Sequence, residues 1–338
     1  QNCTTTSGGY SANSPKLNFS TLPNCATAIV IASCTNVVAT IPAGPGLINF
    51  AGSYPNNSAG TPTSGKEILY SFTPTVTGVY YVDVSSSTGY SNTSFLYKEA
   101  SAGCSSTGWI GICSGYYYGN LGKFPIGMLQ AGIQYYIMLD NELENTITQN
   151  FKICKANVGG GDFCNTSTVK NIVPAFSTKK EYLLDGNGNL VAELDFSNVI
   201  NAVGTISYKY NINTSGIVKR DGDNKEYLDR NFKITTTNQP ANSIGIKLYF
   251  TNAELQALMN EPNDGLADVN NIGDLNVSIT NNGGCGDNVT YSALIPQTGN
   301  GVYDATSSYV KFITSGLLSF YLNGFSSVLL SYQRYFCP

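Results

Sequence analysis

Charged side chains are scarce in this chain. Only 12% of its 338 residues are Asp, Glu, Lys or Arg, about half of the roughly 25% found in typical soluble proteins. The solvent-facing surface must therefore use other polar residues, and the chain supplies 35 Gly, 37 Asn and long runs of Ser and Thr. These residue types favour turns and strand faces over helix surfaces. The composition excludes helical bundles and coiled coils and predicts a β fold.

The chain contains no histidine. This excludes Ser-His-Asp and Cys-His nucleophile systems, HExxH zinc sites and His-ligated haem. The 22 acidic residues form no recognisable carboxylate-pair motif, and the net charge of −4 offers nothing to attract a phosphate backbone. We expect neither an enzyme nor a nucleic-acid-binding protein.

Nine cysteines and no metal-type CxxC pair indicate disulfides, which persist in oxidising compartments. A first residue that is Gln and not Met is what removal of a signal peptide would leave. No apolar run approaches the roughly 18 residues that a transmembrane helix needs. We therefore expect a secreted protein, extracellular or attached to the cell surface, without a transmembrane segment.

The spacing of the cysteines suggests several disulfide pairs. Cys104 and Cys113 flank a Gly/Ser loop and are predicted to staple a hairpin. Further candidate pairs are Cys25 with Cys34 or Cys154, and Cys164 with Cys285. Because nine is odd, at least one thiol lacks a partner within the chain. Cys3 and Cys337 lie near the two ends, where they either bond to another chain or pair with each other.

Short segments of alternating apolar and polar residues, bounded by Gly, Pro, Asn and Ser, predict β-strands. Residues 68–84 are predicted to form a hairpin that turns at Thr77-Gly78, and 181–196 a second hairpin around the sequence DGNGN. Residues 251–259 predict one helix, capped by Thr251 or Asn252. Further strands are predicted at 94–99, 109–113, 116–118, 133–139, 150–154, 203–214, 227–237, 243–251, 275–281 and 310–324.

This pattern predicts an all-β fold of two tandem β-sandwich domains, jelly-roll-like, with one short surface helix in the second. Residues 1–24 are read as an N-terminal arm or leader strand and 25–155 as the first sandwich. A Gly-rich linker at 156–163 is expected to be flexible and to bury nothing. The second sandwich is assigned to 164–325 and a C-terminal tail to 326–338.

The first half of the chain resembles a known domain family. The series CATAIVIASC, LYSFTPTVTGVYYVDVS, SNTSFLYKEASAGCSSTGWIGIC, LQAGIQYYIMLDN and FKIC, over residues 25–155, is similar to the bacterial pre-peptidase C-terminal domain in the version common in secreted Bacteroidetes proteins. The resemblance implies a jelly-roll-like sandwich that accompanies catalytic or adhesive domains and is not itself a catalyst.

The second half resembles a different domain. The strings YLDRNFKITTTNQPANSIGIKLYFTNAEL and SSYVKFITSGLLSFYL, over about 165–325, are similar to a C-terminal β domain of large Bacteroidetes surface proteins that precedes a type IX secretion sorting domain. This resemblance implies that the type IX secretion machinery is a partner during export.

Two constellations are candidate binding sites. Asp185, Asn187, Asn189 and Glu193 have the alternate oxygen side chains of a calcium loop, although a turn that needs only Gly and Asn explains the same residues. We expect no cofactor other than a structural calcium ion at this loop. Trp109 with Tyr116, Tyr117 and Tyr118 is a candidate aromatic platform for a sugar ring, with ordinary sheet packing as the alternative.

These observations favour a non-catalytic cell-surface protein that acts in adhesion or ligand binding, its partner a surface glycan or a protein. One alternative is a structural subunit that self-associates into an extracellular filament or surface layer, because few charges oppose self-association and sheet edges accept a neighbour's strand. A second alternative is an accessory module of a secreted hydrolase.

Overall fold

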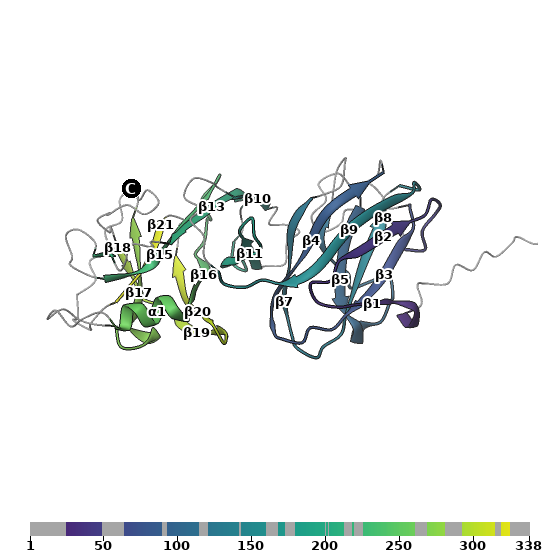
Figure 1. Ribbon diagram of the computed structural model, residues 1–338. Coiled ribbons are helices and arrows are strands. Elements are labelled where there is room, and N and C mark those ends of the chain that lie inside the picture. The colour runs from purple at the N-terminus through teal and green to yellow at the C-terminus, as the bar shows by residue number, and fades with distance from the viewer. Residues whose placement is uncertain are drawn as a thin grey trace, which may run out of the picture.

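The computed structural model describes residues 25–48, 64–89, 93–114, 121–141, 143–159, 168–172, 180–199, 201, 203–212, 218–219, 226–260, 269–280, 293–314 and 319–324. Within these residues the protein is an all-β protein with four sheets and one short α-helix, as predicted. Figure 1 shows the sheets as two lobes in a row, the first built from strands up to β9 and the second from β10 onward.

The first lobe is a sandwich of a five-stranded and a four-stranded sheet. The five-stranded sheet has the order β1 (Ile29–Ile31), β3 (Glu67–Phe72), β8 (Tyr135–Asn141), β5 (Thr93–Glu99), β6 (Ile110–Ser114). The four-stranded sheet has the order β2 (Val37–Ile41), β9 (Ile147–Lys155), β4 (Gly78–Thr88), β7 (Gly122–Leu129). Rings from opposite sheets meet edge to face, with centroids 5.3 Å apart for Phe72 and Tyr80 and 5.0 Å apart for Phe95 and Phe151. These contacts form the first core.

The second lobe also consists of two sheets over one core. One sheet has the order β10 (Thr168–Ile172), β13 (Gly204–Ile212), β15 (Glu226–Thr236), β21 (Ser319–Gly324), β17 (Leu275–Thr280), β18 (Ala293–Ile295), with β14 (Val218–Lys219) also paired to β15. The other has the order β11 (Lys180–Leu184), β12 (Leu190–Asp195), β16 (Ile244–Thr251), β20 (Ser307–Thr314), β19 (Gly299–Asp304). Their shared core includes Ile206, Phe232, Leu194, Ile246 and Phe312.

The predicted helix and the predicted second hairpin are both confirmed. Helix α1 (Asn252–Met259) is capped by Thr251, whose side chain accepts a hydrogen bond from the Glu254 N–H while the Glu254 carboxylate accepts one from the Thr251 N–H. Strands β11 and β12 are antiparallel neighbours on either side of the DGNGN turn. Three short 3₁₀-helices complete the described helical residues: Cys25–Thr27, Ala100–Ala102 and Ile272–Asp274.

The predicted hairpin at residues 68–84 is wrong. Both strands exist, but β3 pairs with β1 and β8, whereas β4 pairs with β7 and β9 in the opposite sheet. The connection between them arches across the sandwich, so that Phe72 and Tyr80 face each other through the core. Alternation along the sequence specifies which residues point inward, but it does not specify which neighbour a strand pairs with.

The described residues contain two disulfides, and their pairing differs from the prediction. Cys104 is bonded to Cys25, so the staple between Cys104 and Cys113 is wrong. Cys34 is bonded to Cys154, so neither partner suggested for Cys25 is correct. The loop after β5 carries Cys104 to the outer side of its sheet, where the 3₁₀-helix of Cys25 packs. Cys3, Cys164, Cys285 and Cys337 lie outside the described residues.

The first residues of the predicted linker are packed, which corrects the expectation that it buries nothing. Ala156 and Val158 are buried, and the Asn157 carbonyl accepts a hydrogen bond of 2.8 Å from the Leu190 N–H. Ala156 and Val158, together with Cys154, belong to a different buried cluster from the core residues Phe151 and Ile153 of β9. None of the helices among the described residues is long and apolar enough to cross a membrane.

Candidate functional site: the junction between the sandwiches

A buried apolar cluster joins the two sandwiches. The strands β4 and β9 and the following residues contribute one side, and the second sandwich contributes the other through β11, β12 and β16. The buried members of this junction cluster are Val79, Tyr81, Cys154, Ala156, Val158, Tyr182, Leu184, Leu190 and Tyr249. Since these side chains are removed from water only while the sandwiches remain in contact, their burial favours a fixed arrangement.

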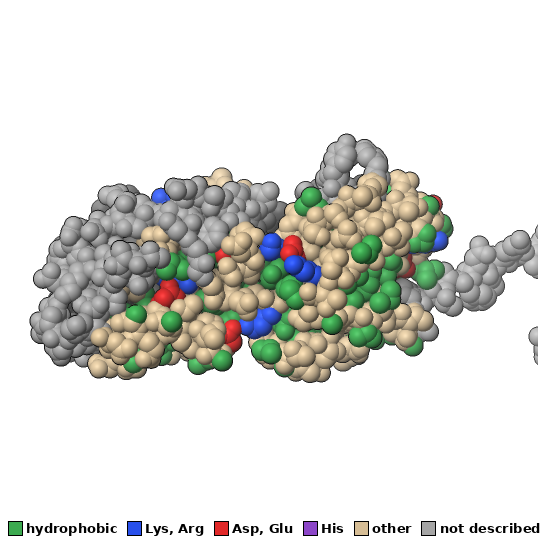
Figure 2. All heavy atoms as spheres, in the orientation of Figure 1, with side chains coloured by type: hydrophobic (Ala, Val, Ile, Leu, Met, Phe, Trp, Pro, Cys, Tyr) green, Lys and Arg blue, Asp and Glu red, His purple; other side chains and the backbone are tan. Residues whose placement is uncertain are grey.

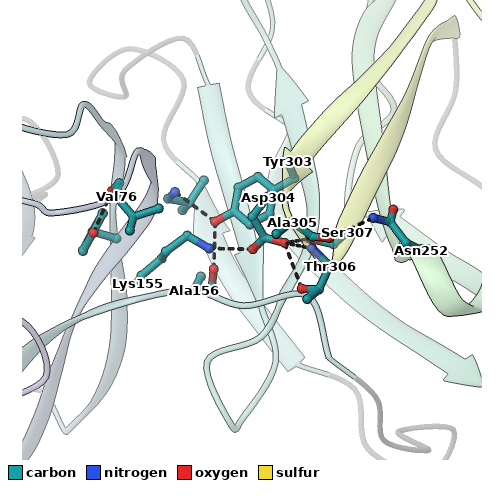
Figure 3. Close-up of polar contacts among 11 residues, drawn as sticks. Val76, Lys155, Ala156, Asn252, Tyr303, Asp304, Ala305, Thr306 and Ser307 are labelled. Carbon is teal, nitrogen blue, oxygen red and sulfur yellow. Dashed lines mark hydrogen bonds and ion pairs between the residues drawn. The ribbon is translucent and has the colours of Figure 1, made fainter.

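The Tyr303 hydroxyl bridges two backbone groups of the first sandwich and the linker. It accepts a hydrogen bond of 3.0 Å from the Val79 N–H and donates one of 2.7 Å to the Ala156 carbonyl. The Ala156 N–H in turn donates to the Val79 carbonyl at 2.7 Å. Tyr303 belongs to β19 of the second sandwich, so these bonds tie β19 directly to β4 and to the end of β9, as Figure 3 shows around the Tyr303 ring.

An ion pair lies beside this bridge. The Lys155 ammonium is 2.7 Å from the Asp304 carboxylate and 4.6 Å from the centroid of the Tyr303 ring (Figure 3). A Cβ atom at Gly78 would lie 2.6 Å from Cε of Lys155. The glycine therefore leaves the space that the lysine side chain occupies on its way to Asp304.

The turn of the second hairpin packs against the first sandwich. Gly188 has a φ of +87°, a backbone conformation that glycine adopts at little cost. A Cβ atom there would lie 2.6 Å from the hydroxyl oxygen of Tyr81 on β4. The positive φ is one reason for glycine at this position, and the close approach of the other sandwich is a second.

The acid side chain of the junction is held in its charged form. Burial raises the pKa of the Asp304 carboxyl, but hydrogen bonds from Lys155, Ser307 and Thr306 outweigh burial and hold the pKa well below its usual value. Burial raises the pKa of the Tyr303 and Tyr249 hydroxyls. Tyr303 therefore keeps the proton that it donates to Ala156 throughout the physiological range.

The junction should weaken in acid. Because the pKa of Asp304 is lower in the folded protein than in the unfolded chain, its carboxylate contributes stability in full above the unfolded value of about 3.9, and this contribution is lost as the pH falls below that value. Urea unfolding measured at a series of pH values should show less loss of stability in acid for Asp304→Asn than for wild type. Glu144→Gln, which alters an exposed acid, is the control. Equal acid sensitivity in wild type and Asp304→Asn would contradict the assignment.

The predicted calcium loop forms a turn closed by its own hydrogen bonds. One oxygen of Asp185 accepts from the backbone N–H groups of Asn187 and Asn189, and the other accepts from the Asn189 amide and the Tyr210 hydroxyl, all within 2.9 Å. The Glu193 carboxylate has separate partners, which are Lys247 at 3.0 Å, Lys180 at 3.3 Å and Tyr249 at 3.3 Å. Among the described residues no group of three or more His, Cys, Asp or Glu side chains is arranged to hold a metal ion. Calcium binding at this turn stays a prediction.

Trp109, the tryptophan of the predicted aromatic platform, is buried. Trp109 is 8% exposed, and its indole N–H donates a hydrogen bond of 2.9 Å to the Ser105 carbonyl. The Lys98 ammonium lies 4.6 Å from the ring centroid and donates to the carbonyls of Ser105 and Thr107. Trp109 therefore packs as a core residue and has no open face for a sugar ring, which corrects that prediction. Residues 116–118 lie outside the described residues.

A buried arginine next to the junction was not predicted. Arg230 on β15 is fully buried, and its guanidinium donates to both carboxylate oxygens of Glu254, at 3.0 and 3.1 Å, and to the Gly159 carbonyl at 3.1 Å. It thus connects β15, helix α1 and Gly159 of the predicted linker. An arginine in an alternating strand is ordinarily placed on the solvent face. The one sequence signal was the capping pattern from Thr251 to Glu254, which fixes a carboxylate that a cation can meet.

Comparisons with known proteins find no match, either to models of protein families or to characterised proteins. The similarity of residues 25–155 to the pre-peptidase C-terminal domain, and of the second half to a surface-protein C-terminal domain, therefore stays an expectation based on the quoted motifs.

Proposed function

We propose that this chain is a non-catalytic structural protein of the cell exterior, in which two β-sandwiches act as one rigid unit that works by contact. The observation that carries the proposal is the Tyr303 bridge, which fastens β19 to two backbone groups across a buried apolar junction. Neighbouring domains move relative to each other by default unless their interface is large and apolar. A protein that transmits or resists force between contacts benefits from suppressing that motion.

Other features support an exterior location and a non-catalytic role. Disulfides close two long loops, and such bonds persist in oxidising compartments. The absence of histidine from the whole sequence removes the commonest general acid and base. Export by the type IX secretion machinery would agree with the sequence resemblance and belongs to the same proposal.

The rigid unit is tested by small-angle X-ray scattering. We expect a single arrangement of the two lobes to account for the scattering of the wild-type chain. Tyr303→Phe should widen the range of relative positions that the two lobes adopt. It should also lower the free energy of unfolding by about 1 to 3 kcal/mol, because it leaves the Val79 N–H and the Ala156 carbonyl without their partner.

Tyr309→Phe is the matched control for this experiment. Tyr309 belongs to the same ring cluster, with its centroid 5.8 Å from that of Tyr249, but among the described residues its hydroxyl makes no hydrogen bond across the junction. We expect its scattering to match wild type. Scattering of the wild-type chain that requires independently moving lobes, or turnover of a substrate by the purified protein, would refute the proposal.

Adhesion to a glycan is the competing function, and a glycan array separates it from the structural one. The burial of Trp109 removes the described part of the aromatic platform. Specific binding on the array that disappears in a Tyr116→Ala, Tyr117→Ala, Tyr118→Ala variant would favour adhesion. A glycan array on which the protein binds nothing, together with ordered assemblies in negative-stain microscopy, would favour the structural function.

A further inference from the structure

One side of the first sandwich is built from an unusually long uncharged stretch of chain. No Asp, Glu, Lys or Arg occurs between Lys16 and Lys66, and both β1 and β2 come from this stretch. Among the described strands, β1 is one of the two edges of the five-stranded sheet, and β2 is one of the two edges of the four-stranded sheet. Natural edge strands usually carry charged side chains or proline, which prevent another strand from pairing with them. Neither β1 nor β2 carries either protection.

These two edges also expose large apolar side chains. Val30 on β1 is 82% exposed and Val38 on β2 is 66% exposed, with Ile29 half exposed beside them. Along β2 the neighbouring Ala39 and Ile41 are buried in the core, so the strand itself is firmly placed. The first sandwich, on the right in Figure 2, shows hydrophobic side chains over this part of its surface and few charged ones.

The neighbouring strand β9 presents uncharged side chains opposite the exposed positions of β2. The exposed positions of β2 are Val38 and Thr40. Val38 pairs in register with Asn150, and Thr40 with Thr148, where the two threonine hydroxyls are 3.0 Å apart. Neither a charge nor a bulky side chain at these positions opposes the approach of a further strand.

We propose that β2 pairs antiparallel with β2 of a second copy of this chain, so that the two four-stranded sheets become one continuous eight-stranded sheet. The outer backbone N–H and C=O groups of an antiparallel edge strand match those of an identical strand turned by a two-fold rotation. Two uncharged edges meet without repulsion, whereas a charged foreign strand would lose the hydration of its charges against Val30 and Val38. The proposal rests on the proposed structural function, to which it adds the partner.

Within the part of the chain that the structure describes, the edge strand β2 offers more for this contact than β1 or β19. Strand β1 has only three residues and a parallel neighbour, so it offers fewer pairing groups. Strand β19 is an edge of the second sandwich, but its Tyr303 and Asp304 are engaged in the junction. In the paired form the apolar residues of β1 would lie beside the new contact and be covered by the second copy.

Light scattering coupled to size-exclusion chromatography, over about a hundredfold range of concentration, measures the dimer. We expect the wild-type full chain to dimerise as concentration rises and Val38→Lys to raise the dissociation constant at least about 10-fold, because it places like charges in a shared edge. Val302→Lys is the matched control. Val302 is 73% exposed on the edge strand β19 of the other sandwich, and we expect no change in dimerisation.

Thr40→Lys, at the other exposed position of β2, repeats the test if Val38→Lys fails to fold. Slower hydrogen exchange of the β2 amides at high concentration is the expected independent signature. A wild-type chain that stays monomeric, or a dimer weakened equally by Val302→Lys, would overturn the pairing. If the chain stays monomeric but scatters as one rigid unit, only the β2 pairing is refuted. If the chain forms a dimer that Val38→Lys weakens, but its lobes move independently, only the rigid unit is refuted.

Discussion

Replacing Cys34 and Cys154 together by alanine is expected to lower the free energy of unfolding by about 4 kcal/mol. The bond joins residues 120 apart in the sequence. Without it the unfolded chain gains the freedom of a very long loop, and loop-closure entropy is the main source of a disulfide's stabilisation. The measurement is guanidinium unfolding followed by circular dichroism, in which the midpoint should fall without loss of the native spectrum.

The second disulfide supplies the comparison. Cys25 and Cys104 close a loop of 79 residues, and replacing both by alanine should destabilise the protein by a similar amount. Only Cys154 belongs to the junction cluster, so only the first double variant should also broaden the arrangement of the lobes in solution scattering. A change in unfolding free energy below about 1 kcal/mol in the first variant would show that the disulfide adds little to stability.

Arg230→Met is expected to cost about 3 to 5 kcal/mol of unfolding free energy. The substitution keeps an unbranched apolar stem but removes both hydrogen bonds to Glu254 and the one to the Gly159 carbonyl. The carboxylate of Glu254 would then remain largely buried without its cation, and breaking one half of a buried ion pair is strongly destabilising. Urea unfolding of the purified variant measures the effect.

Two further variants identify the cause. Arg230→Met combined with Glu254→Gln should recover part of the loss, because the second change removes the unpaired charge. Lys180→Met removes a lysine that pairs with Glu193 while its side chain remains 48% exposed, and should change stability by about 1 kcal/mol or less. If Arg230→Met proved no more harmful than Lys180→Met, the buried pair would not be a source of stability.

Short-range features of the fold were predictable because they depend on neighbours in the sequence. The helix at 252–259 follows from its Thr251 cap and the capping contact with Glu254. The hairpin of β11 and β12 follows from the glycines of the DGNGN turn, where Gly188 takes a positive φ. Most strands were located for the same reason, since their alternation is a local pattern.

The features that were missed all depend on contacts between distant segments. The arch from β3 to β4 places neighbouring strands in opposite sheets, and Cys104 bonds to Cys25 and not to the nearby Cys113. Trp109 is a core residue because it packs with Leu69 and Tyr136, which come from other strands of the sheet. The segment that begins at Ala156 was predicted to be a flexible linker because Tyr303, which donates a hydrogen bond to the Ala156 carbonyl, lies far along the chain.

By itself, the sequence determined that this chain forms strands, where many of them turn and where its helix begins, since backbone preference and side-chain alternation act over a few residues. Only the tertiary structure decided which strands are neighbours, which cysteines meet and which polar side chains are buried at the junction. Those outcomes depend on burying apolar surface and satisfying hydrogen bonds across the whole assembly of sheets, and no local pattern encodes that balance.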